Sequence, residues 1–206
     1  FHHYLMKILK EALDHPKKPI WQLSVLSGGE EEKVLFSFNQ TAQPLMDQTI
    51  SKKLSACVKE HPDRVALIFH GRRMSYRELY ENARRYAYSI ECACPGGGKI
   101  VAVSLEKGFS LVQAMLGAAL SGNAWVIIPA SLPKDRKKDI LLDSSAALLI
   151  SEKSLEPSVP LLTPGGIAGE CPEDYQIRKA EGNDLAYLVY TSGSTGKPKG
   201  CLLYTS

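Results

Sequence analysis

The sequence has no long hydrophobic run, no block of like charges, and no charged and then apolar leader at its N-terminus. Its apolar stretches are short and strand-like, so neither a membrane span nor a signal peptide is indicated. The 25 basic and 22 acidic side chains give a formal charge of +3 that is spread along the chain. This pattern indicates a mixed, solvated surface and argues against a nucleic-acid partner.

Cysteine is scarce, and its spacing matches no known motif. The closest of the five cysteines, Cys92 and Cys94, have one residue between them, which fits neither a redox Cys-x-x-Cys motif nor the spacing of zinc ligands. We therefore expect free thiols, no metal-ligand set in this chain, and a reducing compartment, for which the cytoplasm is the default. The 44% hydrophobic content of the 206 residues is that of a globular protein with a sizeable core.

What the sequence does contain is two regions of different pattern. In the first region, apolar side chains recur at helical spacing from Tyr4 to Leu13, which predicts a docking helix that ends at the following prolines. Ser27 and Glu30 have the spacing of a capping box and predict the start of a second helix. Residues 39–48 are polar and rich in turn-forming residues.

From Thr49 onward, short apolar segments alternate with helical ones. Ser75 and Glu78 form a second capping box, which predicts a helix from Tyr76. The predicted strands span residues 65–69, 100–105, 125–128, 147–150 and 185–190, and the other predicted helices span residues 49–60, 109–120 and 134–142. Such alternation predicts an α/β fold with a mostly parallel sheet that helices cover on both faces. Residues 154–174, rich in proline and glycine, predict a surface connection with at most a short irregular strand.

The segment 190–200, YTSGSTGKPKG, directly follows the last apolar strand. Its three glycines let backbone N–H groups approach a ligand closely, its hydroxyls can donate to phosphate oxygens, and Lys197 and Lys199 supply positive charge. Pro198 follows Gly196 and Lys197, whereas a Walker A loop needs Ser or Thr there to bind magnesium. A flexible Gly/Ser linker is the alternative for a loop of this composition. The flanking strand and the complete string favour a polyphosphate site.

This string resembles the phosphate-loop signature of the acyl-adenylate-forming, AMP-binding superfamily, which includes peptide synthetase adenylation domains, acyl-CoA synthetases and luciferases. Upstream, residues 74–79 (MSYREL) resemble the family segment L-T-Y-x-E-L, and residues 120–129 resemble its segment L-K-A-G-A-A-Y-V-P-L. Where peptide synthetases usually continue with P-L-D-P, residues 128–131 read IPAS, which we interpret as loop variation that loses the acidic residue. The resemblance covers residues 49–200 and implies the incomplete N-terminal subdomain of that fold.

Residues 1–48 resemble the linker that joins a condensation domain to an adenylation domain in nonribosomal peptide synthetases. The recurring L-L-S-x-x-E and W-N-x-T patterns read VLSGGE at 25–30 and FNQT at 38–41, with phenylalanine in place of tryptophan. The resemblance thus implies a linker at 1–48 and the truncated N-terminal part of an AMP-binding adenylation domain at 49–206. Residues 201–206 depart from the family pattern and resemble a translated sequencing adapter, so an artefactual origin is left open for them.

The resemblance also implies the chemistry. Such enzymes let the carboxylate of an amino acid or related acid attack the α-phosphate of ATP, with Mg²⁺ present, which releases pyrophosphate and gives an acyl-AMP. The acyl group then passes to the phosphopantetheine of a carrier-protein domain, downstream of a condensation domain in the same polypeptide, in secondary metabolite biosynthesis. The residues expected to bind the ATP phosphates are Thr191, Ser192, Gly193, Ser194, Thr195, Gly196 and Lys197, together with Lys199, for which a surface charge is an equal alternative.

The main catalytic residues, substrate pocket and adenine contacts of this family lie downstream of the phosphate loop, so we expect residues 1–206 alone to be inactive. Two alternatives stay open: an acyl-CoA or fatty-acyl-AMP ligase, and a nucleotide-binding remnant without turnover. We assign no carboxylate to catalysis. Glu78, Glu106 and Asp143 lie at expected helix starts or ends, where capping and dipole effects explain them.

Overall fold

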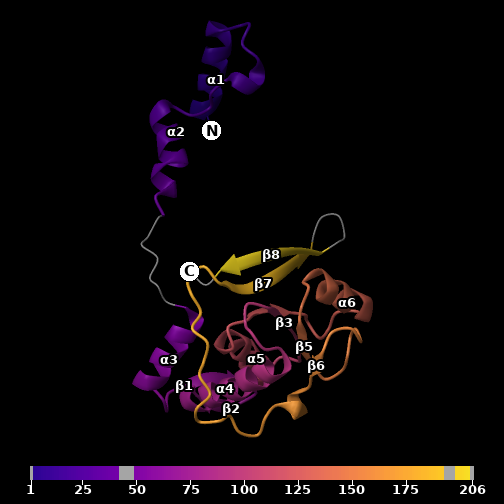
Figure 1. Cartoon of the computed structure of the whole chain (residues 1–206). Helices are drawn as coiled ribbons and strands as arrows, with labels where there is room; N and C mark the ends of the chain where they lie inside the picture. The colour runs from indigo at the N-terminus through magenta and orange to yellow at the C-terminus, as the bar shows by residue number, and fades with distance from the viewer. Residues whose placement is uncertain (1, 42–48, 193–197, 205–206) are drawn as a thin grey trace. The chain divides into compact units, whose positions relative to one another are not determined.

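The computed structural model describes residues 2–41, 49–192 and 198–204. The chain forms two compact units, Phe1–Leu45 and Met46–Ser206 (Figure 1). All five cysteines are free thiols, as predicted. In the part of the chain that the structure describes, no helix is both long and apolar enough to cross a membrane.

The first unit consists of short helices. They are α1 (His2–Asp14), the 3₁₀ turn η1 (Ile20–Gln22), α2 (Gly28–Leu35) and the 3₁₀ turn η2 (Ser37–Asn39). α2 begins at the predicted capping box: the Glu30 N–H donates to Ser27 Oγ (3.3 Å), and the Ser27 N–H donates to the Glu30 carboxylate (2.9 Å). These bonds satisfy donors that a helix start otherwise leaves free. None of these four segments contains a buried residue.

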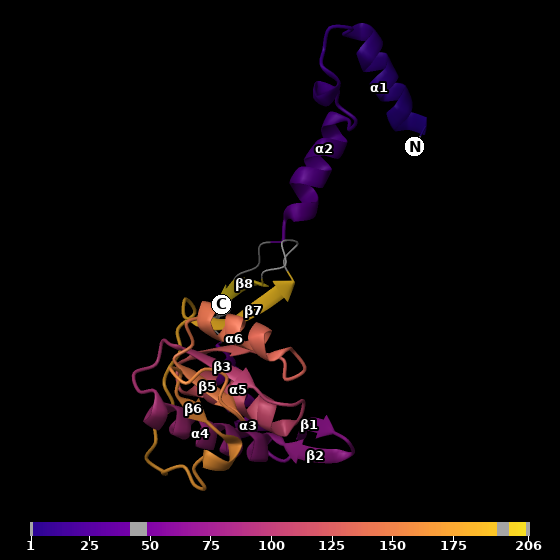
Figure 2. The ribbon, with the colours of Figure 1, turned by 90° about the vertical axis from the view of Figure 1, so that its right-hand side faces the viewer.

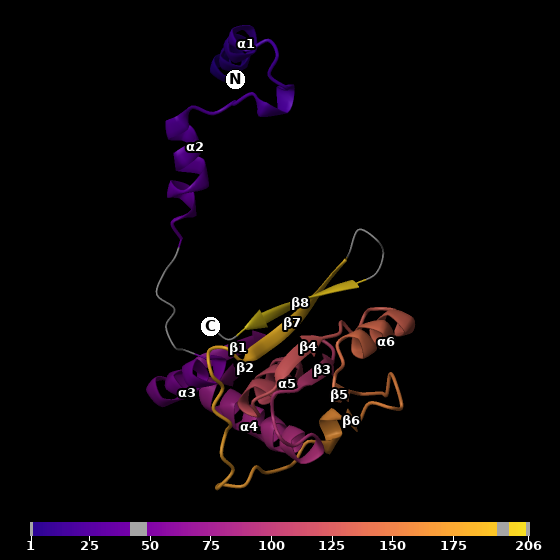
Figure 3. The same cartoon turned by 45° about the horizontal axis from the view of Figure 1, so that its top comes forward.

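The second unit is built on a six-stranded sheet with the strand order β6-β5-β3-β4-β7-β8 (Figure 3). Its strands are β3 (Ile100–Ser104), β4 (Ala124–Ile127), β5 (Leu148–Ser151), β6 (Leu161–Leu162), β7 (Leu185–Ser192) and β8 (Pro198–Tyr204). The pairs β3–β4, β3–β5, β4–β7 and β5–β6 are parallel, and β8 runs antiparallel to β7. The fold is therefore α/β with a mostly parallel sheet, as predicted.

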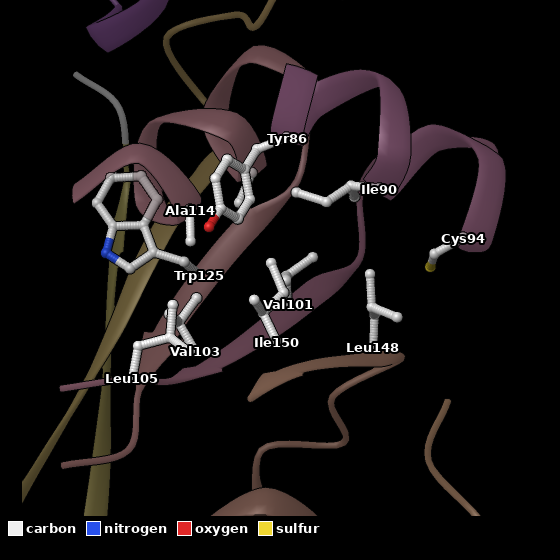
Figure 4. Close-up of a cluster of buried hydrophobic side chains, with 11 residues drawn as sticks. Tyr86, Ile90, Cys94, Val101, Val103, Leu105, Ala114, Trp125, Leu148 and Ile150 are labelled. Carbon is white, nitrogen blue, oxygen red and sulfur yellow. The ribbon is translucent and has the colours of Figure 1, made fainter. Parts of the chain in front are cut away.

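Helices cover both faces of this sheet. The helices of the unit are α3 (Ile50–Glu60), α4 (Tyr76–Ala93), α5 (Phe109–Leu120) and α6 (Lys134–Asp143). α4 and α5 pack on one set of alternating strand residues, such as Val101, Val103 and Ile150 (Figure 4). α6 packs on the intervening set, such as Val126 and Leu149, and Figure 2 shows α4 and α6 on opposite sides of β3 and β5. The strands are apolar throughout because successive side chains point to opposite, equally covered faces.

α4 and α5 pack so closely that one position has no room for a side chain. Gly117 of α5 faces α4, and a Cβ added there would lie 2.4 Å from Tyr86 Cβ and 3.2 Å from the Ala83 carbonyl oxygen. Atoms at these distances overlap, so the contact between the helices requires glycine. α4 itself begins at the second predicted capping box, formed by Ser75 and Glu78.

A separate two-stranded antiparallel sheet precedes α4. It pairs β1 (Val65–Phe69) with β2 (Arg72–Ser75) through a turn at His70 and Gly71, whose φ angles are 47° and 75°. Two successive positive φ angles are typical of a type I′ hairpin turn, in which glycine is favoured. The apolar run of β1 predicts a strand, whereas β2 was not predicted because its residues RRMS contain no apolar run.

The chain returns to the sheet through a long connection that lies along α4. The connection contains β6 and the 3₁₀ turn η3 (Pro164–Gly166), which agrees with the short strand expected there. Hydrogen bonds with two arginines and a serine hold its backbone to α4. Arg85 Nε donates to the Ala168 carbonyl oxygen (3.1 Å), and the Ala168 N–H donates to Ser89 Oγ (2.9 Å). The Arg84 guanidinium donates to the carbonyl oxygens of Pro172 (3.3 Å) and Tyr175 (3.2 Å). These bonds fix the path by which the chain reaches β7.

Candidate functional site

The carboxyl ends of four parallel strands, β3, β4, β5 and β7, lie at one edge of the sheet. Segments that leave parallel strands gather along such an edge, and in open α/β sheets ligands bind outside the carboxyl ends of the strands. β7 ends at Ser192. The segment predicted to bind phosphates therefore leaves the sheet at the edge where this kind of fold holds its ligands.

The predicted phosphate-binding residues divide into described and undescribed positions. Thr191 lies in β7 with an exposed side chain, and its backbone is in register with that of Lys199 in β8. Ser192 ends β7, and its backbone is in register with that of Pro198. Gly193, Ser194, Thr195, Gly196 and Lys197 lie outside the described residues. The antiparallel pair β7–β8 thus forms a stem that brings together the backbones of Thr191, Ser192 and Lys199.

Tyr190 connects this stem to α6. Its hydroxyl donates a hydrogen bond to Asp143 Oδ2 over 2.6 Å, and its ring is partly buried against the face of the sheet that α6 covers. Burial, and then the bond to the Asp143 carboxylate, raise the pKa of the Tyr190 hydroxyl above its usual range. The hydroxyl therefore stays protonated at neutral pH and remains a donor.

The contact with Tyr190 changes the explanation of Asp143. The sequence places this carboxylate at a helix end, and it is the last residue of α6. The helix dipole disfavours negative charge there, and the hydrogen-bond partner of Asp143 lies 47 residues further along the chain. No local sequence signal indicates such a pair. By contrast, Glu78 is a capping residue, as predicted.

A cavity of about 630 Å³ lies beside β4 and β7. Trp125 and Tyr187 form part of its wall, where their rings stack with centroids 5.2 Å apart and an angle of 15° between the planes. Thr191 also lines the cavity, and Arg136 of α6 adds a charged side chain. The first predicted phosphate-binding residue therefore stands at the border of a largely apolar cavity, which sequence analysis did not anticipate.

The described residues contain no cluster of metal-ligating side chains. Within residues 2–41, 49–192 and 198–204, no three His, Cys, Asp or Glu side chains lie close enough together to hold a metal ion.

Comparison with known proteins relates the chain to one family. Residues 54–206 match the family described as AMP-binding enzyme. The chain is similar to tyrocidine synthase 2 of Brevibacillus parabrevis, with 31% identity over 209 residues. This match covers 98% of the chain but 6% of that protein. It is also similar to surfactin synthase subunit 3 of Bacillus subtilis, with 29% identity over 204 residues. That match covers 95% of the chain and 16% of the relative. The chain thus spans a small part of the length of these relatives.

Solved structures agree with this relation. The N-terminal subdomain of Klebsiella oxytoca NpsA, in complex with anthranilyl-AMSN, matches with 29% identity and a TM-score of 0.71, over 78% of this chain and 42% of that chain. The nonribosomal peptide synthetase FmoA3 in its α-methyl-L-serine-AMP bound form matches with a TM-score of 0.79, over 98% of this chain and 24% of that chain. The identity to FmoA3 is 22%, so this second match shows the fold alone.

Proposed function

The chain belongs to the AMP-binding enzyme family as the N-terminal part of a nonribosomal peptide synthetase adenylation domain, and we propose that it supplies the ATP phosphate-binding part of that domain. The complete domain activates an amino acid or a related carboxylic acid as acyl-AMP. The acyl group then passes to the phosphopantetheine thiol of a carrier-protein domain. Residues 1–48 link the adenylation domain, which starts near residue 49, to an upstream condensation domain in the same cytoplasmic polypeptide.

One observation carries the proposal. The string YTSGSTGKPKG at 190–200 starts at the carboxyl edge of a mostly parallel sheet, where the fold places ligands. The use of ATP is supported by the match of residues 54–206 to the family described as AMP-binding enzyme.

The reaction explains why such a loop is needed. A carboxylate oxygen attacks the α-phosphorus of ATP, the bond to the bridging oxygen breaks, and negative charge grows on the departing pyrophosphate. The hydroxyls of Thr191 and Ser192, the hydroxyls and N–H groups of the glycine-rich residues that follow, and the ammonium of Lys197 are suited to stabilise that charge. Mg²⁺ bound to the nucleotide would share it. Lys199, in β8 opposite Thr191, is the weakest candidate for this role.

The test is acid-dependent exchange of pyrophosphate into ATP by the complete polypeptide that contains this chain. With a panel of amino and aryl acids, we expect exchange with at least one acid. Replacing Lys197 with alanine should lower the rate by about 10²-fold, the usual loss when one group that stabilises developing charge is removed. Lys59→Ala, on the surface of α3, is the matched control and should leave the rate unchanged.

Other outcomes would replace this proposal. Exchange with fatty acids, combined with release of AMP that depends on soluble coenzyme A, would indicate an acyl-CoA or fatty-acyl-AMP ligase. Binding of ATP without exchange for any acid would indicate a nucleotide-binding remnant. The purified 206-residue chain should show no exchange by itself, and measurable exchange would contradict the expectation that the main catalytic residues lie outside it.

A further inference from the structure

Tyr190 lies in β7, where β7, β8 and the end of α6 meet. Its backbone belongs to β7, directly before the predicted phosphate-binding residue Thr191. Its hydroxyl is bonded to Asp143 at the end of α6 (2.6 Å), and its backbone is in register with that of Gly200 in β8. The Tyr190 side chain is therefore bonded to the end of α6, while its backbone pairs with β8 at Gly200.

Gly200 shows how close the contact with β8 is. A Cβ added at Gly200 would lie 3.2 Å from Cζ, 3.4 Å from Cε1 and 3.4 Å from the hydroxyl oxygen of Tyr190. Gly200 is not among the glycines with positive φ, so its backbone conformation does not require glycine. The ring of Tyr190 lies over this position, so a Cβ added there would be in tight contact with it, and the ring would have to shift by a few tenths of an ångström.

We propose that Tyr190 is a positioning residue for ATP, which holds the ends of β7 and β8 in one arrangement relative to α6 through its contacts with Asp143 and Gly200. The proposal rests on the proposed function, because it concerns the residues expected to bind the phosphates. Donors that stabilise a transferring phosphoryl group must be held to within a fraction of an ångström, and a displacement of about 1 Å can cost about 10²-fold in rate. Thr191 follows Tyr190 directly, and Lys199 precedes Gly200.

If Tyr190 served only to pack the core, its substitutions would have different effects. Tyr190 also packs beside Ile140 and Leu188 in the core between the sheet and α6. If this packing were its whole contribution, phenylalanine would serve equally well, because it keeps the ring and loses only the hydroxyl. The hydrogen bond to Asp143 would then have no effect on the use of ATP.

The first experiment separates these roles in the complete polypeptide. Tyr190→Phe and Asp143→Ala should each raise the KM for ATP by roughly three- to tenfold, less than the full loss of a hydrogen bond to a charged group because this bond acts on ATP only through the position of the strand ends. Both should leave the KM for the acid unchanged. Asp143→Asn keeps a carbonyl acceptor and should restore most of the affinity. The double variant Tyr190→Phe/Asp143→Ala should be no worse than either single variant, since both remove the same bond. Tyr80→Phe, on α4, is the matched control.

The second experiment tests the contact with Gly200. Gly200→Ala should raise the KM for ATP when Tyr190 is present, because the new Cβ pushes the ring away. In a Tyr190→Val background, which removes the ring, the same substitution should add no further loss. Equal losses in both backgrounds would overturn this part of the proposal.

A third readout is independent of turnover. Amide hydrogen exchange of the β7–β8 stem should be faster in Tyr190→Phe than in the wild type, whereas exchange in β3 and β5 should be unchanged. If the wild type catalyses pyrophosphate exchange and Tyr190→Phe matches it in KM and in amide exchange, the positioning role is wrong and the proposed function stands. If no acid supports pyrophosphate exchange in the wild type, the proposed function fails, and with it the role of Tyr190 toward ATP.

Discussion

The two units of the chain begin helices with the same local signal but differ in what those helices bury. α2 in the first unit and α4 in the second both start at a Ser-x-x-Glu capping box in which both reciprocal hydrogen bonds are made. α2 buries no residue, whereas α4 buries Ala87 and Ile90 completely. Capping thus decides where a helix begins, while packing against other elements decides how much the helix adds to the stability of the fold.

α1 shows the same difference for apolar side chains. Leu5, Leu9 and Leu13 occupy its apolar face but are 47%, 48% and 80% exposed. In the second unit, strand residues such as Val103 and Ile150 are 0% exposed. Because the hydrophobic effect scales with the area removed from water, we assign most of the stability of the described chain to the second unit.

Removing an apolar side chain from each unit should give the largest difference in stability between the two units. Ile150→Ala opens a cavity between the sheet and α4, and we expect a loss of about 2–5 kcal/mol in the free energy of unfolding of the 206-residue chain. Leu9→Ala in α1 should change this free energy by less than about 0.5 kcal/mol. Urea denaturation monitored by tryptophan fluorescence measures both. A loss of similar size for Leu9→Ala would contradict this assignment, because it would show that the Leu9 side chain is packed against other residues.

Replacing one glycine in each unit with alanine should have opposite effects in the two units. Gly117→Ala forces the new Cβ against Tyr86 and should destabilise the second unit by about 1–3 kcal/mol. Gly29 of α2 has no atom within 4 Å of an added Cβ, so Gly29→Ala should favour the helix by up to about 1 kcal/mol through its intrinsic propensity. The first effect appears in urea denaturation, and the second in the NMR chemical shifts of α2. Destabilisation by both substitutions would contradict this account.

The smallest expected effect is a pH dependence. Bonds from the Ser27 N–H and then the Ser27 hydroxyl lower the pKa of Glu30 to about 2, and the equivalent bonds from Ser75 lower the pKa of Glu78. Each cap therefore stabilises its helix fully above the ordinary carboxyl pKa of 4.5, and for Glu30 this contribution is lost as the pH falls towards 2. Protonation of Glu30 should reduce the helicity of α2 only, whereas protonation of Glu78 should also weaken the second unit.

NMR titration of the two carboxyl groups measures these pKa values directly. The matched variants are Ser27→Ala and Ser75→Ala, and each should move the pKa of its own glutamate back towards the ordinary value while leaving the other unchanged. A Glu30 that titrates at its ordinary pKa in the wild type would show that the capping box of α2 does not persist in solution.

Sequence patterns predicted those features that depend on neighbouring residues. The strand Val65–Phe69 and the helix Phe109–Leu120 match the predicted spans residue for residue, because an apolar run and a helical repeat are local properties. β4 begins and ends one residue earlier than predicted. β2 was missed because its polar residues pair only after the His70–Gly71 turn has formed.

The candidate site was likewise predictable only where it depends on neighbouring residues. Its phosphate-binding residues could be proposed from one continuous string, and their contacts with a ligand stay a prediction. The bond between Asp143 and Tyr190, the need for glycine at Gly117 and the tight contact of Gly200 with the Tyr190 ring could not be predicted, because each depends on elements that meet only in the folded chain.

The strand order has a consequence for biosynthesis. β4 pairs with β3 on one side and with β7 on the other, but the ribosome makes β7 only after α6, β5, β6 and the long connection that lies along α4. At a synthesis rate of about 5–20 residues per second, β4 therefore keeps one unpaired edge for several seconds. An exposed strand edge can pair with other nascent chains. Co-translational aggregation should consequently depend on how fast the ribosome passes the segment between β4 and β7.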